Sequence, residues 1–173
     1  SRASRTFPQY LIFKPGMIIT AILLYFYWHK NNVLINSFKN TNSIKNSFMI
    51  YGVLSAVFLM LHSILLGLET DIKIFKFLRR VILVSFIIFE IIAQSLLVLN
   101  LYKLKNQLKN FFYPNILKLK ILLVSTLMFV ALISIPLLIV GGNIHFKHGL
   151  EWNYFIGVIL FYLLTCLFWK KIS

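Results

Sequence analysis

Apolar residues fall in long blocks along this chain, and short basic connectors separate the blocks. A helix needs about 20 mostly apolar residues to cross about 30 Å of hydrocarbon. Four blocks meet this requirement clearly, while the first block is interrupted by Lys14, Pro15 and Gly16. The predicted spans cover residues 11–28, 47–68, 81–101, 119–140 and 152–169. The pattern therefore predicts an all-α, polytopic membrane protein with five transmembrane helices, which form a single domain over residues 1–173.

Two details of this pattern concern the ends of the helices. We expect Pro15 in the first turn of the first helix, where its missing N–H costs nothing. After the third span, apolar residues recur at helical spacing opposite lysines: Leu101, Leu104, Leu108 and Phe111 against Lys103, Lys105 and Lys109. This spacing predicts that the third helix continues along the membrane surface and ends near Pro114.

The composition excludes several classes of protein. Hydrophobic residues make up 60% of the chain and charged residues 13%, whereas a soluble domain carries about 25% charged residues. The chain has one cysteine, Cys166, which excludes a scaffold held by intramolecular disulfides. It also lacks a glycine-rich phosphate loop and the common hydrolase motifs. We therefore expect a non-enzymatic membrane protein without a cofactor.

The net charge of +14 arises from 18 lysines and arginines against four acidic residues. Most of the basic residues lie between or beside the apolar blocks, where they can reach lipid headgroups. Anionic membrane lipids are therefore the expected partners, together with a possible protein partner in the membrane, and nucleic acid is not expected. The distribution of lysines favours a cytoplasmic C-terminus, and we expect an inner or plasma membrane rather than an organelle.

Glu90 is the strongest single indication of chemistry. It lies about ten residues into the predicted third helix, where an ionised carboxylate costs several kcal/mol. Gln94 follows one turn later on the same face, and His62 in the second helix is the candidate partner at similar depth. These three residues form either a protonatable cluster that faces a cavity or a set of neutral hydrogen bonds that packs the helices.

A second polar group precedes the last span. His145, His148 and Glu151 recur at every third residue, a spacing that can place metal ligands on one side of a helical turn. Gly142 and Gly149 bracket this run, and no cysteine lies near it. An interfacial polar loop is therefore the favoured interpretation, with His145 and His148 as weak metal candidates.

The last span resembles that of a known family. The residues that carry the resemblance are His148, Glu151, Trp152, Tyr154 and Phe155, followed by Tyr162 and Thr165. They look like the last helix of the DRAM/Frag/Sfk family, also described by the Cwh-type N-terminal domain. The resemblance implies a six-helix protein of lipid remodelling or membrane organisation, with its first helix missing here. Glu151 and Trp152 are the matched positions.

Three functions follow as hypotheses. The first is a non-enzymatic integral membrane protein that organises or senses membrane lipids. The second is a small transporter or proton-coupled channel that uses Glu90 as its titrating group. The third is an accessory subunit of a larger membrane complex.

Overall fold

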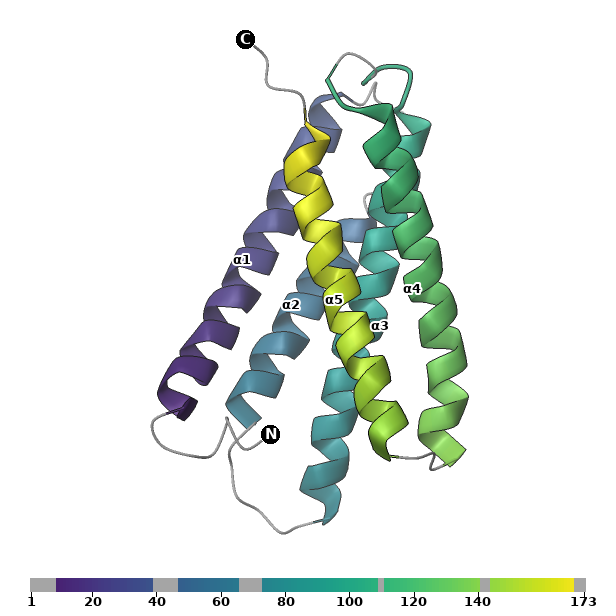
Figure 1. Cartoon of the computed structure of the whole chain (residues 1–173). Helices are drawn as coiled ribbons and strands as arrows, with labels where there is room; N and C mark the ends of the chain where they lie inside the picture. Colours follow the sequence, from purple (N-terminus) through teal and green to yellow (C-terminus); the bar gives the residue numbers. More distant parts are fainter. Residues whose placement is uncertain (1–8, 39–46, 66–72, 109–110, 141–143, 170–173) are drawn as a thin grey trace. The chain divides into compact units, whose positions relative to one another are not determined.

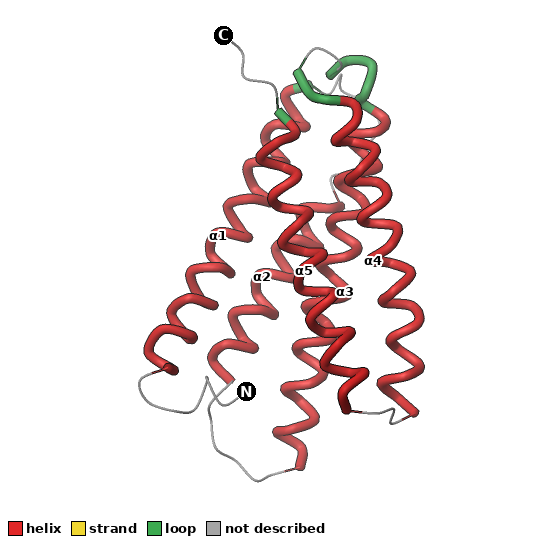
Figure 2. The backbone as a smooth tube through the Cα atoms, in the orientation of Figure 1, coloured by secondary structure: helices red, strands yellow, loops and turns green. Residues whose placement is uncertain are grey.

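The computed structural model describes residues 9–38, 47–65, 73–108, 111–140 and 144–169, apart from the side chains of residues 9–10, 73, 76, 135–140, 144–148 and 150–152. Figures 1 and 2 show the helices of this part of the chain. They are α1 (Gln9–Ser37), α2 (Ser47–Leu65), α3 (Lys73–Lys103), α4 (Pro114–Val140) and α5 (Ile144–Phe168). The described ranges otherwise hold short turns and an isolated bridge between Phe112 and Trp169. The prediction of an all-α fold is confirmed for these residues.

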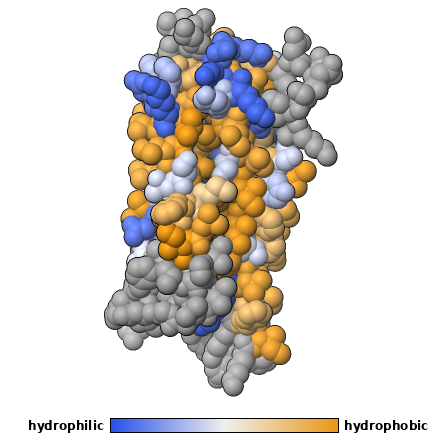
Figure 3. Space-filling model, turned by 90° about the vertical axis from the view of Figure 1, so that its right-hand side faces the viewer, coloured by the Kyte–Doolittle hydropathy of each residue, from blue (hydrophilic) through white to orange (hydrophobic). Residues whose placement is uncertain are grey.

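Four of the described helices are long and apolar enough to cross a membrane. The apolar stretches are Leu11–Ser37, Ser47–Leu65, Phe77–Lys103 and Pro114–Ser134, while the apolar stretch described in α5, Asn153–Phe168, is shorter. Large apolar side chains dominate the surface in Figure 3, and Phe129, for example, is 64% exposed. Such a surface is costly in water and compatible with hydrocarbon. The chain is a multi-pass membrane protein.

The first helix differs from its predicted bounds at both ends. α1 begins at Gln9, so Pro15 lies inside the helix and not in its first turn. It also continues nine residues past Trp28, the predicted end. The continuation has a physical reason, because the Asn31 amide donates a hydrogen bond to the Tyr27 carbonyl at 2.8 Å and Ile35 is buried. Polar residues in this segment therefore stay compatible with a helix.

The later helices also begin before their predicted spans. α3 starts eight residues before the predicted position 81, and α4 starts with Pro114 at its first helical position, which suits a residue without an N–H. α5 starts at Ile144, eight residues before position 152. The end predicted at residue 68 for the second span lies outside the described residues, since α2 is described to Leu65.

The predicted helical extension after α3 is wrong. α3 ends at Lys103, and hydrogen-bonded turns follow as far as Leu108. Leu104 and Leu108 are nevertheless buried, and Lys105 is exposed. The apolar spacing thus reflects side chains that pack inward from irregular backbone. Spacing alone does not distinguish such a segment from an amphipathic helix on a membrane surface.

The chain divides into two compact units, residues 1–93 and 94–173, and α3 contributes to both. In the first unit α1 and α2 run antiparallel and pack closely (Figure 1). Trp28 is fully buried there and lies against Gly52, where an added Cβ would collide with the indole ring. A glycine therefore allows the close approach of these two helices. The prediction of one domain for the whole chain stays a prediction.

In the second unit α4 and α5 run antiparallel (Figure 1). Gly157 of α5 lies against the buried Leu127 of α4, again with no room for a Cβ. At the end of α5 the Tyr113 N–H donates to the Phe168 carbonyl at 3.1 Å, and the rings of Phe112 and Phe168 stack with centroids 4.8 Å apart. These contacts join the start of α4 to the end of α5.

Candidate functional site

The carboxyl group of Glu90 is fully buried in the first unit and touches a serine of α2. The Ser55 hydroxyl donates a hydrogen bond to Glu90 Oε2 at 2.7 Å, and it also lies 2.8 Å from the Gly52 carbonyl oxygen. Phe89, the neighbour of Glu90, stacks on Phe58 and Tyr51 of α2, with ring centroids 5.4 and 6.1 Å apart. These aromatic contacts fix the register at which α3 presents Glu90 to Ser55.

The predicted polar cluster also contains Gln94 and His62. Gln94 is fully buried one turn after Glu90 on α3. His62 lies seven residues after Ser55 on α2, a distance of about 10 Å along the helix axis. The interactions of His62 involve the backbone and the charge of Arg79, near the start of α3. The structure thus places Ser55 at hydrogen-bonding distance of Glu90 and places His62 beside Arg79.

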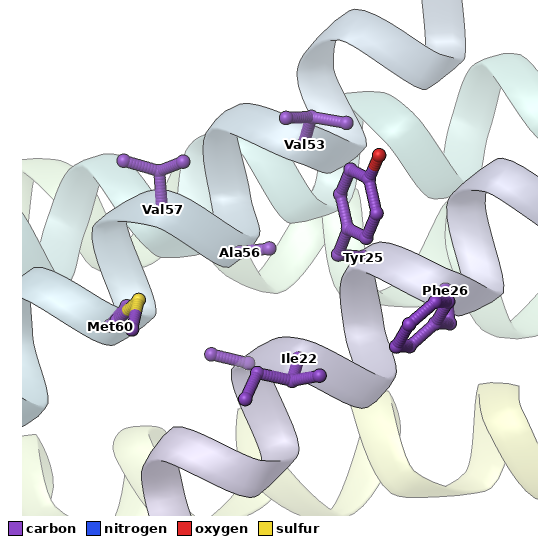
Figure 4. A pocket seen from close by; sticks show the side chains of 8 residues that line it. Ile22, Tyr25, Phe26, Val53, Ala56, Val57 and Met60 are labelled. Atoms are coloured by element: carbon purple, nitrogen blue, oxygen red, sulfur yellow. The ribbon is translucent and has the colours of Figure 1, made fainter.

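An apolar groove of about 260 Å³ lies between α1 and α2. Figure 4 shows the lining side chains as sticks, with those of α1 and those of α2 on opposite sides of the groove. The lining residues are Ala21, Ile22, Tyr25 and Phe26 of α1 and Val53, Ala56, Val57 and Met60 of α2. All of them belong to the two stretches that are long and apolar enough to cross a membrane. The groove therefore offers an apolar ligand a site at membrane depth.

Polar residues follow the groove along α1. The Tyr25 ring, which lines the groove, stacks on His29 with centroids 6.2 Å apart and planes 12° apart. His29 and Lys30 are exposed one turn further along α1. An imidazole and a cationic residue thus follow the lining residues of the groove along α1, an arrangement that suits an amphiphile with an anionic head.

The second unit contains a buried lysine. Lys120 in the second turn of α4 has no exposed surface, and its ammonium group donates a hydrogen bond to Thr165 Oγ1 at 2.6 Å. Its Nζ lies 4.3 Å from the ring centroid of Phe161 and 5.4 Å from that of Phe168. The Thr165 hydroxyl donates in turn to the Phe161 carbonyl at 3.0 Å. A hydroxyl and two aromatic faces, all from α5, surround this cation.

Sequence reasoning treated Lys120 as one more basic residue of a membrane surface. Little in the sequence indicates that Lys120 is buried, because Lys118, two residues earlier in the same segment, is exposed. A rotation of 200° along a helix separates such neighbours onto nearly opposite faces. The aromatic pair Phe161 and Phe168 also recurs at a seven-residue spacing in α5, which placed both rings on one face.

The remaining predicted residues fall outside the described side chains. His145, His148, Glu151 and Trp152 belong to α5, which is described there as backbone only. Among the residues that the structure does describe, no group of three or more potential ligands could hold a metal ion.

Comparison with known proteins adds no relative to this picture. No protein-family model, curated protein or solved structure matches the chain.

Proposed function

We propose that this chain is a non-enzymatic integral membrane protein that organises membrane lipids by holding an acyl chain in the groove between α1 and α2. The groove is the observation that carries the proposal, because it is apolar, open and located within two membrane-spanning stretches. In a bilayer its surroundings are hydrocarbon chains, so the occupant of matching chemistry is a lipid tail.

The polar residues that follow the groove on α1 favour an anionic lipid. Lys30 lies five residues after Tyr25, about 7.5 Å along the helix axis, and both Lys30 and His29 are exposed. A basic residue near the membrane surface attracts anionic lipid by about 1 kcal/mol. A headgroup bound at His29 and Lys30 would leave its acyl chain to follow Tyr25 into the groove.

The proposal agrees with what the resemblance to the DRAM/Frag/Sfk family implies, namely a role in lipid organisation. We also propose an inner or plasma membrane as the location and a cytoplasmic C-terminus, on the basis of the lysine distribution along the sequence.

Photo-crosslinking tests the groove directly. The full chain is reconstituted in vesicles that contain phosphatidylglycerol with a diazirine on its acyl chain, and the cross-linked peptides are mapped by mass spectrometry. We expect adducts on residues 21–26 and 53–60. Val57→Phe fills the groove from an exposed wall position and lowers the adduct yield several-fold, whereas Leu61→Phe, at an exposed position of α2 outside the groove, leaves it unchanged.

The headgroup is tested with the same assay. Lys30→Gln reduces the preference for phosphatidylglycerol over phosphatidylcholine and leaves the adduct positions unchanged. Adducts that spread evenly over exposed apolar residues such as Leu122 and Phe129, and that do not respond to Val57→Phe, would contradict the proposal.

The buried Ser55–Glu90 hydrogen bond favours a second candidate, a proton-coupled transporter with Glu90 as its titrating group. The test is proton flux in liposomes that contain the purified chain. Transport requires a flux that is lost in Glu90→Gln, and a folded wild-type chain without flux would eliminate this candidate.

A further inference from the structure

Basic residues of α1 and α3 lie at one end of the first unit, where α2 ends and α3 begins (Figure 1). We propose that Arg79 and Arg80 at this end bind the phosphate group of an anionic lipid, with Lys14 of α1 nearby. This site is separate from the groove and its polar residues. Lys14 precedes Lys30 on α1 by 16 residues, about 24 Å along the helix axis, so the site lies towards the opposite membrane surface.

Contacts of the last turn of α2 with both neighbouring helices bring these residues together. The Ser63 hydroxyl donates a hydrogen bond to the Lys14 carbonyl at 3.4 Å. His62, the preceding residue, interacts with the backbone and the charge of Arg79. Lys14 and Arg79 therefore flank the last turn of α2, and the cations of α1 and α3 belong to one end of the first unit.

The two arginines lie at the depth of lipid phosphates. They are the third and fourth residues of the membrane-spanning stretch Phe77–Lys103, and the edge of such a stretch is where basic side chains extend to headgroups. Arg80 is exposed, while Arg79 is half-buried with its Cζ 5.5 Å from the ring centroid of Phe75. Ile74, one turn before the arginines, is 77% exposed. Apolar side chains for lipid tails thus lie beside guanidinium groups for a headgroup.

The chemistry of the arginines favours a phosphomonoester. A guanidinium group binds phosphate through two parallel N–H···O bonds, which an ammonium group cannot form. Arg79 and Arg80 are adjacent in the sequence and bring two positive charges to one place. A phosphomonoester carries about −1.5 to −2 charges near pH 7, whereas a phosphodiester headgroup is singly charged. Phosphatidic acid is therefore the lipid whose headgroup charge matches this pair.

The membrane is the source of the matching anion within the described part of the chain. Among the side chains that the structure describes, the acid is Glu90. It follows Arg79 on α3 by 11 residues, about 16 Å along the helix axis, which is too far for an ion pair. Glu69 and Asp71 precede α3 in the sequence and lie outside the described residues, so the experiment includes variants of both.

Native mass spectrometry of the full chain with added lipid tests the site. We expect wild type to bind phosphatidic acid several-fold more tightly than phosphatidylglycerol or phosphatidylcholine. Arg79→Gln combined with Arg80→Gln should abolish this preference. Arg79→Lys keeps the charge and should lower the preference several-fold, because it removes the paired hydrogen bonds. A phosphatidic acid with a diazirine next to its glycerol should form adducts on the exposed residues Ile74, Phe77, Leu78 and Val81.

The matched control is Lys105→Gln combined with Lys118→Gln, which removes two charges from exposed positions of the second unit and should leave the preference unchanged. Lys30→Gln should also leave it unchanged, so the result is independent of the groove. An equal loss of preference in both double variants would overturn the proposal, because net charge alone would then explain the binding.

Two further outcomes would overturn the proposal. The first is displacement of phosphatidic acid by an equal concentration of glycerol 3-phosphate, since the site would then take a soluble phosphate rather than a lipid. The second is a preference for phosphatidic acid that appears only in Glu69→Gln combined with Asp71→Asn. Those two acids would then neutralise the arginines in the wild-type chain.

Discussion

Two buried ionisable side chains contact hydroxyl groups of neighbouring helices. Glu90 of α3 meets the hydroxyl of Ser55 in the first unit, and Lys120 of α4 meets the hydroxyl of Thr165 and two aromatic rings in the second. A hydroxyl serves both because it can donate to a carboxyl oxygen and accept from an ammonium group. Each contact joins two helices, so the polar groups contribute to packing as well as to possible chemistry.

Ser55→Ala removes a hydrogen bond to Glu90 and should lower the free energy of unfolding by about 1 kcal/mol, a typical value for an interhelical hydrogen bond in a membrane. The measurement is reversible unfolding in mixed micelles. Ser134→Ala is the matched control, because the Ser134 hydroxyl donates to the Val130 carbonyl of its own helix. An equal decrease in the free energy of unfolding of both variants would contradict a specific role for Ser55.

Lys120→Met should leave the free energy of unfolding unchanged or raise it by about 1–2 kcal/mol. Methionine keeps the packing of the lysine stem and removes a charge that burial destabilises. Lys120→Ala should instead lower the free energy of unfolding by about 2–5 kcal/mol, because it leaves a cavity. The same unfolding assay applies, with the exposed Lys118→Met as control. A large loss in Lys120→Met would show that the ammonium group itself holds α4 and α5 together.

At the scale of elements, a glycine among the described residues lies at a helix contact in each unit. Gly52 makes room for Trp28 between α1 and α2, and Gly157 makes room for Leu127 between α4 and α5. Membrane helices gain little from apolar burial against one another, because lipid tails are as apolar as the side chains. Close approach at a small residue, which maximises van der Waals contact, therefore has greater weight here than in a soluble bundle.

Gly52→Ala and Gly157→Ala should each lower the free energy of unfolding by about 1–3 kcal/mol, since the added methyl group forces the facing side chain to move. Gly16→Ala and Gly149→Ala are matched controls in α1 and α5, where nothing lies within 4 Å of the added Cβ. In these controls the free energy of unfolding should stay unchanged or rise by up to about 1 kcal/mol, because alanine has a higher helix propensity than glycine. Thermal unfolding of all four variants in one detergent distinguishes the two outcomes.

At the scale of the whole molecule, the membrane topology depends on α5. Four helices contain apolar stretches long enough to span, and α5 has a shorter described stretch from Asn153 to Phe168. The helix as a whole has 25 residues, which corresponds to about 37 Å. We expect α5 to cross the membrane as the fifth span, so that the two ends of the chain lie on opposite sides.

Cysteine accessibility tests this topology. The single native cysteine is first replaced in Cys166→Ser, and cysteines are then introduced one at a time at Thr41, Thr70, Asn110 and Asn143 between the helices. An impermeant maleimide added to intact cells should label Thr41→Cys and Asn110→Cys from one side of the membrane and the other two variants from the opposite side. A cysteine introduced at Ser173 should follow Thr41→Cys. Labelling of Ser173→Cys together with Asn143→Cys would mean that α5 does not cross.

The sequence by itself determined the class of protein, the helices and the position of Glu90 inside an apolar stretch. These features depend on local quantities, namely the length and hydropathy of each segment and the cost of a charge inside it. It did not determine the bounds well, since α1, for example, continues past Trp28 through polar residues such as Asn31, whose side chain bonds to its own helix backbone.

Only the tertiary structure decided which side chains meet. It assigned Ser55 to Glu90, enclosed Lys120 between Phe161 and Phe168, and left a groove over Ala21 and Ala56. These contacts depend on the rotation of each helix about its axis and on its register with its neighbour. A segment such as α4, which is apolar nearly all round, carries no polar stripe that fixes this rotation, so its facing residues follow from steric fit between side chains.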